Sequence, residues 1–190
     1  MDTEIVKIVQ KDFLGKGGTK MVYRHPENPD LCIKFPKERR RALHGLLREI
    51  KYLKRHQDAL PFLAPYLGEI QCDMGTGYLY EVVKNEDGSP STGIGEHLHR
   101  LDKDVLGEKI KIIYQQLVAE HAVVNDLQFN NIFVKEKKSG DYDLCLVDGF
   151  GNTDYIKICD YSKFFLLKKL HRKFKKLCRK LEIPHDFLYE

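Results

Sequence analysis

Residues 126–134, DLQFNNIFV, and residues 146–151, LVDGFG, decide the fold that we predict for this chain. Asp126 and Asn131 lie five positions apart in an expected loop between a helix and a strand, and Asp148 ends the next expected strand. A loop and a neighbouring strand end can bring these side chains together, which a single helix could not do. Phosphoryl transfer needs such a set: a carboxylate beside the acceptor hydroxyl, and an amide oxygen and a second carboxylate on magnesium. Taken alone, an Asp-Gly pair is more often just a turn.

A glycine-rich segment, LGKGGTKMV, occupies residues 14–22. Gly15, Gly17 and Gly18 would let backbone amides approach phosphate oxygens, because glycine has no Cβ. Lys16 and Val22 complete the segment, and we include both in the candidate nucleotide site. The alternative is a glycine hairpin turn that binds no ligand.

Two further segments follow in the order that this chemistry needs. Lys34 ends the apolar segment LCIK at residues 31–34, and Glu49 lies fifteen residues later in an expected helix. The segment YLYEVV at residues 78–83 is apolar, and we expect a strand that ends at Val83 and can offer the backbone groups of Glu81 and Val83 to a ligand. Each has a simpler alternative: Lys34 could be a solvated strand end, Glu49 could lie on a solvated helix face, and residues 78–83 could form a plain edge strand.

In this order the segments resemble the protein-kinase-like fold, with its motifs G-x-G-x-x-G-x-V, V-A-I-K, D-L-x-x-x-N and D-F-G. The resemblance implies ATP and Mg²⁺ as ligands and a role for each candidate residue. Nucleotide binding is implied for Gly15, Lys16, Gly17, Gly18, Val22, Lys34, Glu81 and Val83, catalysis for Asp126 with Lys34 and Glu49, and metal binding for Asn131 and Asp148.

The chain departs from the kinase pattern at several positions. Lys20 stands where the third glycine is expected, and Gln128 stands where Ser/Thr protein kinases have a lysine. Val124-Asn125 replaces the usual His-Arg. Only 39 residues follow Gly151, and no A-P-E occurs among them, so we expect no protein substrate in the usual groove.

Two longer stretches resemble the small bacterial YrbL family, which is associated with the PhoP regulatory network. They are YRHPENPDLCIK at residues 23–34 and CDMGTGY at residues 72–78. This resemblance covers most of the chain. It implies a kinase-like architecture and says little about the substrate.

We predict an α+β protein with a minimal bilobal kinase-like fold. The first lobe, residues 1–83, would hold an antiparallel sheet with one helix, and its strands would begin over residues 5–14. The second, residues 84–190, would be a truncated helical lobe that ends in a basic helix. We expect a buried apolar stripe on each of two helices. On the helix of the first lobe it is Leu43, Leu46, Leu47, Ile50 and Leu53. On the last, basic helix it is Leu166, Leu170, Phe174, Leu177 and Leu181.

The net charge of +4 is local, because residues 163–180 hold nine Lys or Arg and no acid, which leaves the remainder at −5 (4 − 9). We favour an amphipathic helix with solvated lysines. An anionic substrate or membrane surface is the first alternative, and nucleic acid is disfavoured because only charge supports it.

The five scattered cysteines contain no C-x-x-C pair, the histidines show no zinc-ligand spacing, and no apolar run could span a bilayer. We therefore expect a cytoplasmic protein.

The favoured function is therefore an ATP-dependent phosphotransferase that acts on a hydroxyl of an unidentified acceptor, either a small molecule, a sugar or lipopolysaccharide, or a protein. One alternative is a pseudokinase, a nucleotide-binding regulatory module without turnover. A second alternative is a protein that binds an anionic partner through its basic C-terminal helix.

Overall fold

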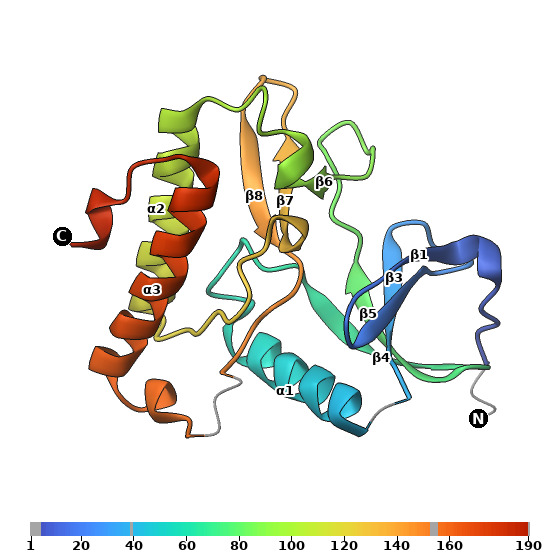
Figure 1. The fold of residues 1–190 in the computed structure, drawn as a ribbon. Coiled ribbons are helices and arrows are strands. Elements are labelled where there is room, and N and C mark those ends of the chain that lie inside the picture. Colours follow the sequence, from blue (N-terminus) through green and yellow to red (C-terminus); the bar gives the residue numbers. More distant parts are fainter. Residues whose placement is uncertain (1–4, 39, 153–155, 190) are drawn as a thin grey trace. The chain divides into compact units, whose positions relative to one another are not determined.

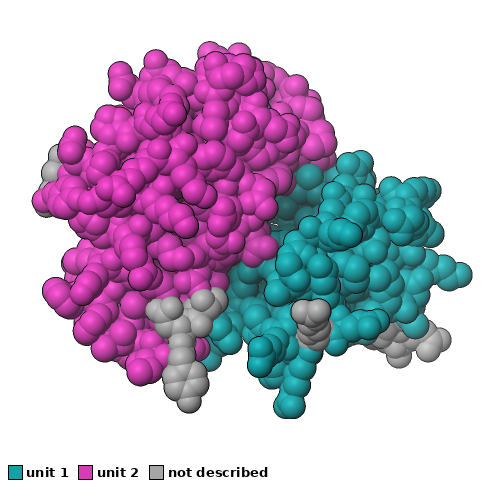
Figure 2. All heavy atoms as spheres, viewed as in Figure 1, with its two compact units in different colours: residues 1–57, 64–82 teal, residues 58–63, 83–190 magenta. Residues whose placement is uncertain are grey.

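The computed structural model describes residues 5–38, 40–152 and 156–189, which fold as a mixed α+β protein with two antiparallel sheets (Figure 1). The predicted α+β class is confirmed. The chain divides into two compact units, the first of residues 1–57 and 64–82 and the second of residues 58–63 and 83–190 (Figure 2).

The first unit is built on a five-stranded antiparallel sheet of order β1-β2-β3-β5-β4. Its elements are η1 (Gln10–Asp12), β1 (Phe13–Lys16), β2 (Lys20–Arg24), β3 (Leu31–Pro36), α1 (Arg40–His56), β4 (Tyr66–Cys72) and β5 (Gly75–Glu81). The predicted strand over residues 5–14 is wrong for most of its length. Val6 makes only an isolated bridge to Cys72, and the polar residues 10–12 interrupt the alternation and form a 3-10 turn.

Strand alternation gives this sheet one apolar face and one face with charged residues. Tyr23, Ile33 and Phe35 form an apolar cluster, against which residues of the N-terminal segment pack. Lys20 and Lys34 alternate with these residues and therefore lie on the other face, where α1 packs against β3 and β4.

Helix α1 is rotated relative to the predicted stripe. Leu46, Ile50 and Leu53 are buried as predicted, but Leu43 and Leu47 are 37% and 40% exposed. The buried residues that replace them are Ala42, Glu49 and His56. The rotation follows from the partners of Glu49, because its carboxylate meets lysine side chains of the sheet.

The second unit combines a three-stranded antiparallel sheet of order β6-β7-β8 with two long helices. Its elements are β6 (Thr92–Gly93), η2 (Ile94–Glu96), α2 (Lys103–Ala119), η3 (Phe129–Asn131), β7 (Ile132–Glu136), β8 (Tyr142–Leu146), η4 (Ile158–Asp160), α3 (Lys163–Leu181) and η5 (Asp186–Leu188). Helices α2 and α3 lie side by side (Figure 1), and the rings of Tyr114 and Phe174 meet edge to face at 5.2 Å.

The apolar stripe predicted for the last helix is confirmed, since its five members are at most 1% exposed. The expectation that the helix's lysines are all solvated is wrong. Lys169 is 6% exposed, and its Nζ donates to Oδ1 of Asn152 at 2.9 Å. All five cysteines are buried and unbridged. Within the described ranges, no helix is long and apolar enough to cross a membrane.

Candidate functional site

The first unit brings Lys34 and Glu49 together on the α1 face of its sheet. The Nζ atom of Lys34 lies 3.9 Å from Oε1 of Glu49 and 3.9 Å from the ring centroid of Tyr80. Both charged side chains are buried, with 7% and 5% of the residue exposed. A buried ion pair of this kind holds an ammonium in a fixed place, which is what phosphate binding by lysine requires.

Lys20 is the residue of this cluster that sequence reasoning missed. Its Nζ donates to Oε2 of Glu49 at 2.7 Å, a shorter contact than that of Lys34. The available signal was the alternation in β2, because Lys20 precedes Val22 by two and therefore points to the same face.

The predicted nucleotide-binding residues of the sheet form one row across three strands. Gly15 pairs with Val22 in register, and Val22 pairs with Lys34. Side chains that are paired in this way lie on the same face. Cys32 is on that face two residues from Lys34, and burial raises the pKa of its thiol although the Lys34 ammonium acts in the opposite direction. Cys32 is therefore not an activated nucleophile.

The glycines of the β1–β2 turn are not required by the packing of the described residues. A Cβ added at Gly15, Gly17 or Gly18 would meet no atom within 4 Å, and none of the three has a left-handed φ. The turn is held instead by Gly17, whose N–H donates to the Lys20 carbonyl at 2.9 Å, and whose carbonyl accepts from Lys37 Nζ at 2.6 Å. The Cβ-free surface of the turn is open to a ligand.

Glu81 ends β5, and Val83 lies two residues beyond it. The N–H of Glu81 donates to the Pro65 carbonyl at 3.2 Å, and the carbonyl of Val83 accepts from the N–H of Ser91 at 3.0 Å. Glu81 is the last residue of β5, so the strand stops two residues short of the predicted end at Val83. Adenine binding by these residues stays a prediction.

In the second unit, residues 123–126 and 147–151 pair through an isolated antiparallel bridge between Val124 and Phe150 and the backbone hydrogen bonds around it. The Gly149 carbonyl accepts from the N–H groups of Asn125 and Asp126 at 2.8 and 3.3 Å, and the N–H of Gly151 donates to the Val123 carbonyl at 3.0 Å. The N–H of Val147 donates to the Asn131 carbonyl at 3.0 Å. This pairing brings together the two segments that decided the sequence prediction.

The three predicted oxygen-bearing residues therefore lie in one loop cluster. Nδ2 of Asn131 donates to Oδ2 of Asp126 at 3.2 Å and to its carbonyl at 3.3 Å, which orients the amide. Oδ1 of Asp148 accepts from the N–H of Gly149 at 2.6 Å. Gly149 has φ +89°, and a Cβ there would lie 2.6 Å from the Asp126 carbonyl oxygen, so only glycine fits against the backbone of Asp126.

An amide oxygen and a carboxylate oxygen are hard ligands that suit Mg²⁺, which keeps several waters and takes phosphate oxygens as further ligands. Asn131 and Asp148 fit this requirement. The described part of the chain contains no group of three or more His, Cys, Asp or Glu that could hold a metal ion. Two protein ligands of this kind suit a magnesium ion that keeps its waters and arrives with phosphates.

Lysines of α3 border the same loop, and sequence reasoning missed their proximity. Lys173 donates through Nζ to the Asn125 carbonyl. Burial, and then repulsion by Lys169 and Arg172, lowers the pKa of Lys173, while the Asp126 carboxylate acts in the opposite direction. The sequence shows that this stretch is basic, but nothing in its spacing links Lys173 to Asn125, which lies 48 positions earlier.

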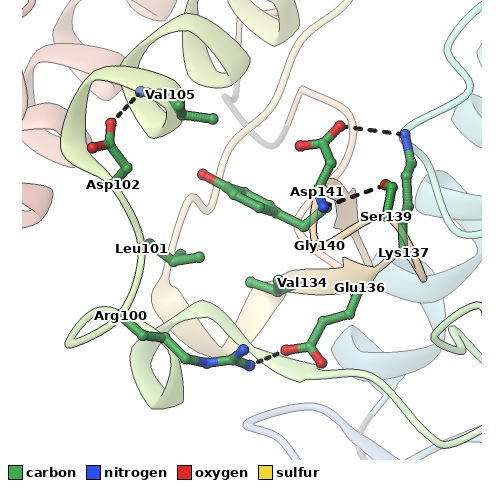
Figure 3. A pocket seen from close by; sticks show the side chains of 11 residues that line it. Arg100, Leu101, Asp102, Val105, Val134, Glu136, Lys137, Ser139, Gly140 and Asp141 are labelled. Atoms are coloured by element: carbon green, nitrogen blue, oxygen red, sulfur yellow. Dashed lines mark hydrogen bonds and ion pairs between the residues drawn. The ribbon is translucent and has the colours of Figure 1, made fainter.

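A larger cavity of about 510 Å³ lies elsewhere in the second unit, between residues 100–105 and the β7–β8 hairpin (Figure 3). None of the predicted site residues lines it. Its charged groups pair with one another: Arg100 with Glu136, and Lys137 with Asp141 at 3.8 Å. With Asp102, the lining carries two cationic and three anionic side chains, a formal charge of −1 (2 − 3), which disfavours a phosphate ligand, so we place the candidate site at the loop cluster.

Comparison with known proteins gives a family but no activity. The family described as PhoP regulatory network protein YrbL matches residues 6–182. Two relatives, each called "Uncharacterized protein YrbL", come from Escherichia coli (strain K12) and Shigella flexneri. Each is 27% identical over 180 residues, which cover 90% of this chain and 86% of the relative.

Proposed function

The chain belongs to the family of the PhoP regulatory network protein YrbL, and we propose that it is an ATP-dependent phosphotransferase acting on a hydroxyl group. We also propose that its fold is a reduced relative of the protein kinase fold. The proposal rests on one observation above all: the pairing of residues 123–126 with 147–151 gathers two carboxylates and an amide in one loop cluster.

In the proposed reaction Asp126 orients the acceptor hydroxyl and accepts its proton. Asn131 and Asp148 hold magnesium, which when bound would neutralise charge on the transferred phosphoryl group. In the first unit Lys34 binds phosphate oxygens and Glu49 fixes its position. Catalysis then rests on positioning and on charge stabilisation rather than on a covalent intermediate.

The open glycine turn adds support from the first unit. Glycines that neither adopt a left-handed φ nor pack closely cost conformational entropy without a structural return. Close approach of a ligand to the backbone explains their presence at Gly15, Gly17 and Gly18. ATP as the donor and the five unbridged cysteines both agree with a cytoplasmic protein, the location that we propose.

One observation favours a nucleotide-binding regulator without turnover. Glu49 shares its carboxylate between Lys34, at 3.9 Å, and Lys20, at 2.7 Å, so the ion pair that an active kinase needs is divided with a second, closer lysine. The family description as a regulatory network protein agrees with this alternative. We keep it as the second candidate.

The test compares Mg-ATP binding with ADP formation in the same full-length variants. In thermal denaturation, Mg-ATP at 100 times its dissociation constant should add about 2.7 kcal/mol of stability. Asp148→Asn should abolish the magnesium-dependent part of this shift. Asp126→Asn should retain the shift and lower ADP formation to background. Asp141→Asn, an exposed aspartate in the turn before β8, is the matched control and should change neither.

The outcomes separate the candidates. A thermal shift with ADP formation that falls in Asp126→Asn supports the phosphotransferase. A thermal shift with background ADP formation in the wild type supports the regulator. The absence of any shift with Mg-ATP overturns both.

A further inference from the structure

Four lysines of α3 form a row along one face of the helix: Lys169, Lys173, Lys176 and Lys180. Their spacing of four, three and four residues repeats the spacing of the buried apolar stripe, each lysine preceding a stripe residue by one. The row therefore borders the packed side of α3. The other basic residues of the helix include Lys168 and Arg179, which are exposed and lie off this row.

The lysine row runs beside the loop cluster of the candidate site. Lys169 donates to Oδ1 of Asn152 at 2.9 Å, and Lys173 donates to the Asn125 carbonyl. Nζ of Lys180 lies 5.9 Å from the ring centroid of Phe129. These contacts place three of the four lysines beside the two segments of the loop cluster, one containing Asp126 and the other Asp148.

A small cavity separates the row from the loop. Asp126 lines it together with Lys173, Lys176 and Lys180, and the remaining lining residues are Asn125, Leu127, Gln128 and Leu177. Three lysines and one aspartate line it, so the lining carries a formal charge of +2 (3 − 1). Its volume is about 50 Å³, and a water molecule occupies about 30 Å³ in the liquid. One small anionic group fits there, whereas a nucleoside does not.

We propose that this cavity binds a phosphate group carried by the acceptor, so that the acceptor is a phosphorylated compound with a free hydroxyl. The proposal rests on the proposed function, because it takes Asp126 as the group that meets the hydroxyl. The acceptor's phosphate occupies the cavity against Lys173, Lys176 and Lys180, and the rest of the acceptor stays outside it and presents its hydroxyl to Asp126, which lines the cavity.

Charge repulsion within the row gives a physical reason for this assignment. Like charges at i,i+3 and i,i+4 on a helix destabilise it, and the row contains three such successive pairs. A phosphate bound among the ammonium groups relieves this repulsion. Its attraction to three lysines outweighs its repulsion by the single Asp126 carboxylate. Gln128, at the position where Ser/Thr kinases have a lysine, leaves the loop itself without a cation, and α3 supplies the cations instead.

The experiment titrates inorganic phosphate into the full chain without ATP or magnesium and follows the backbone amide resonances of residues 125–128. Wild type should show saturable shifts. Lys176→Gln/Lys180→Gln should raise the dissociation constant about tenfold, or about 1.4 kcal/mol. Lys168→Gln/Arg179→Gln removes the same charge from exposed positions of the same helix and should change it less than twofold. Equal weakening by both pairs, or no saturable shift, overturns the proposal.

A second arm distinguishes the sources of the phosphate. Glycerol 3-phosphate represents a soluble acceptor, and phosphatidylglycerol vesicles represent a lipid headgroup. Binding of either one that depends on Lys176 and Lys180 supports the proposal and assigns the source. Binding of neither overturns it. Because nucleotide is absent from both arms, this result is independent of whether the chain forms ADP, and Asp148→Asn should bind phosphate as wild type does.

Discussion

Replacing Gly149 by alanine tests the loop pairing on which the candidate site depends. Gly149 has φ +89°, a region that costs an L-residue about 1–2 kcal/mol. Its new Cβ would also lie 2.6 Å from the Asp126 carbonyl oxygen and 3.0 Å from the Asp126 Cβ. The backbone of residues 125–126 must therefore shift, and overpacking of this kind costs about 1–3 kcal/mol.

Gly140→Ala is a matched control in the same unit. Gly140 has φ +84°, nearly the same conformation, but a Cβ there would meet nothing within 4 Å. Gly140→Ala should lose stability through backbone strain alone. The lower conformational entropy of its unfolded chain offsets part of that loss. We expect a loss of about 1 kcal/mol for Gly140→Ala and about 2–4 kcal/mol for Gly149→Ala.

The measurement is the free energy of unfolding in urea, followed by far-UV circular dichroism because the chain has no tryptophan. The difference between the two variants isolates the close approach of Gly149 to Asp126. Equal losses would refute the pairing of residues 123–126 with 147–151. The shared position of Asp126 and Asp148 would then have no support.

Three further predictions concern stability. Glu49→Gln should cost about 3–5 kcal/mol because it leaves the buried Lys20 ammonium without its carboxylate, and adding Lys20→Met should recover part of this loss in urea titrations. Burial raises the pKa of Tyr142 to about 12, so the folded chain keeps this proton where the unfolded chain loses it, above pH about 10. Stability from this group is complete below pH 10 and falls between pH 10 and 12. Tyr142→Phe should therefore lose about 1.4 kcal/mol less than wild type per pH unit there, and parallel curves would contradict this. Leu46→Ala should cost about 2–5 kcal/mol and Leu47→Ala less than about 0.5 kcal/mol, because the first side chain is buried and the second is exposed.

The sequence predicted features that depend on local periodicity. The apolar stripe of α3 is one example, since residues three and four apart share a helix face regardless of what covers it. The α+β class and the antiparallel sheet of the first unit are others. The strand over residues 5–14 failed because the polar residues 10–12 ended an apolar run that looked continuous at its start.

Features that depend on distant partners were not predictable in this way. Helix α1 turns Glu49 inward because lysines of the sheet meet it, and Lys20 lies 29 positions away in sequence. Periodicity alone ranked Leu43 and Leu47 above a glutamate for burial. The contact between Lys173 and Asn125 spans 48 positions and was missed for the same reason.

Helix α3 combines packing and charge, and this decides how its function must be tested. Deleting residues 163–190 would remove the lysine row, but it would also remove five side chains that are at most 1% exposed, and each such loss costs several kcal/mol. The second unit would then unfold, and any loss of anion binding would follow from that alone. Substituting Lys176 and Lys180 leaves the apolar stripe intact, because both side chains are exposed and lie beside it. Only point substitutions of this kind separate the charge of α3 from its packing.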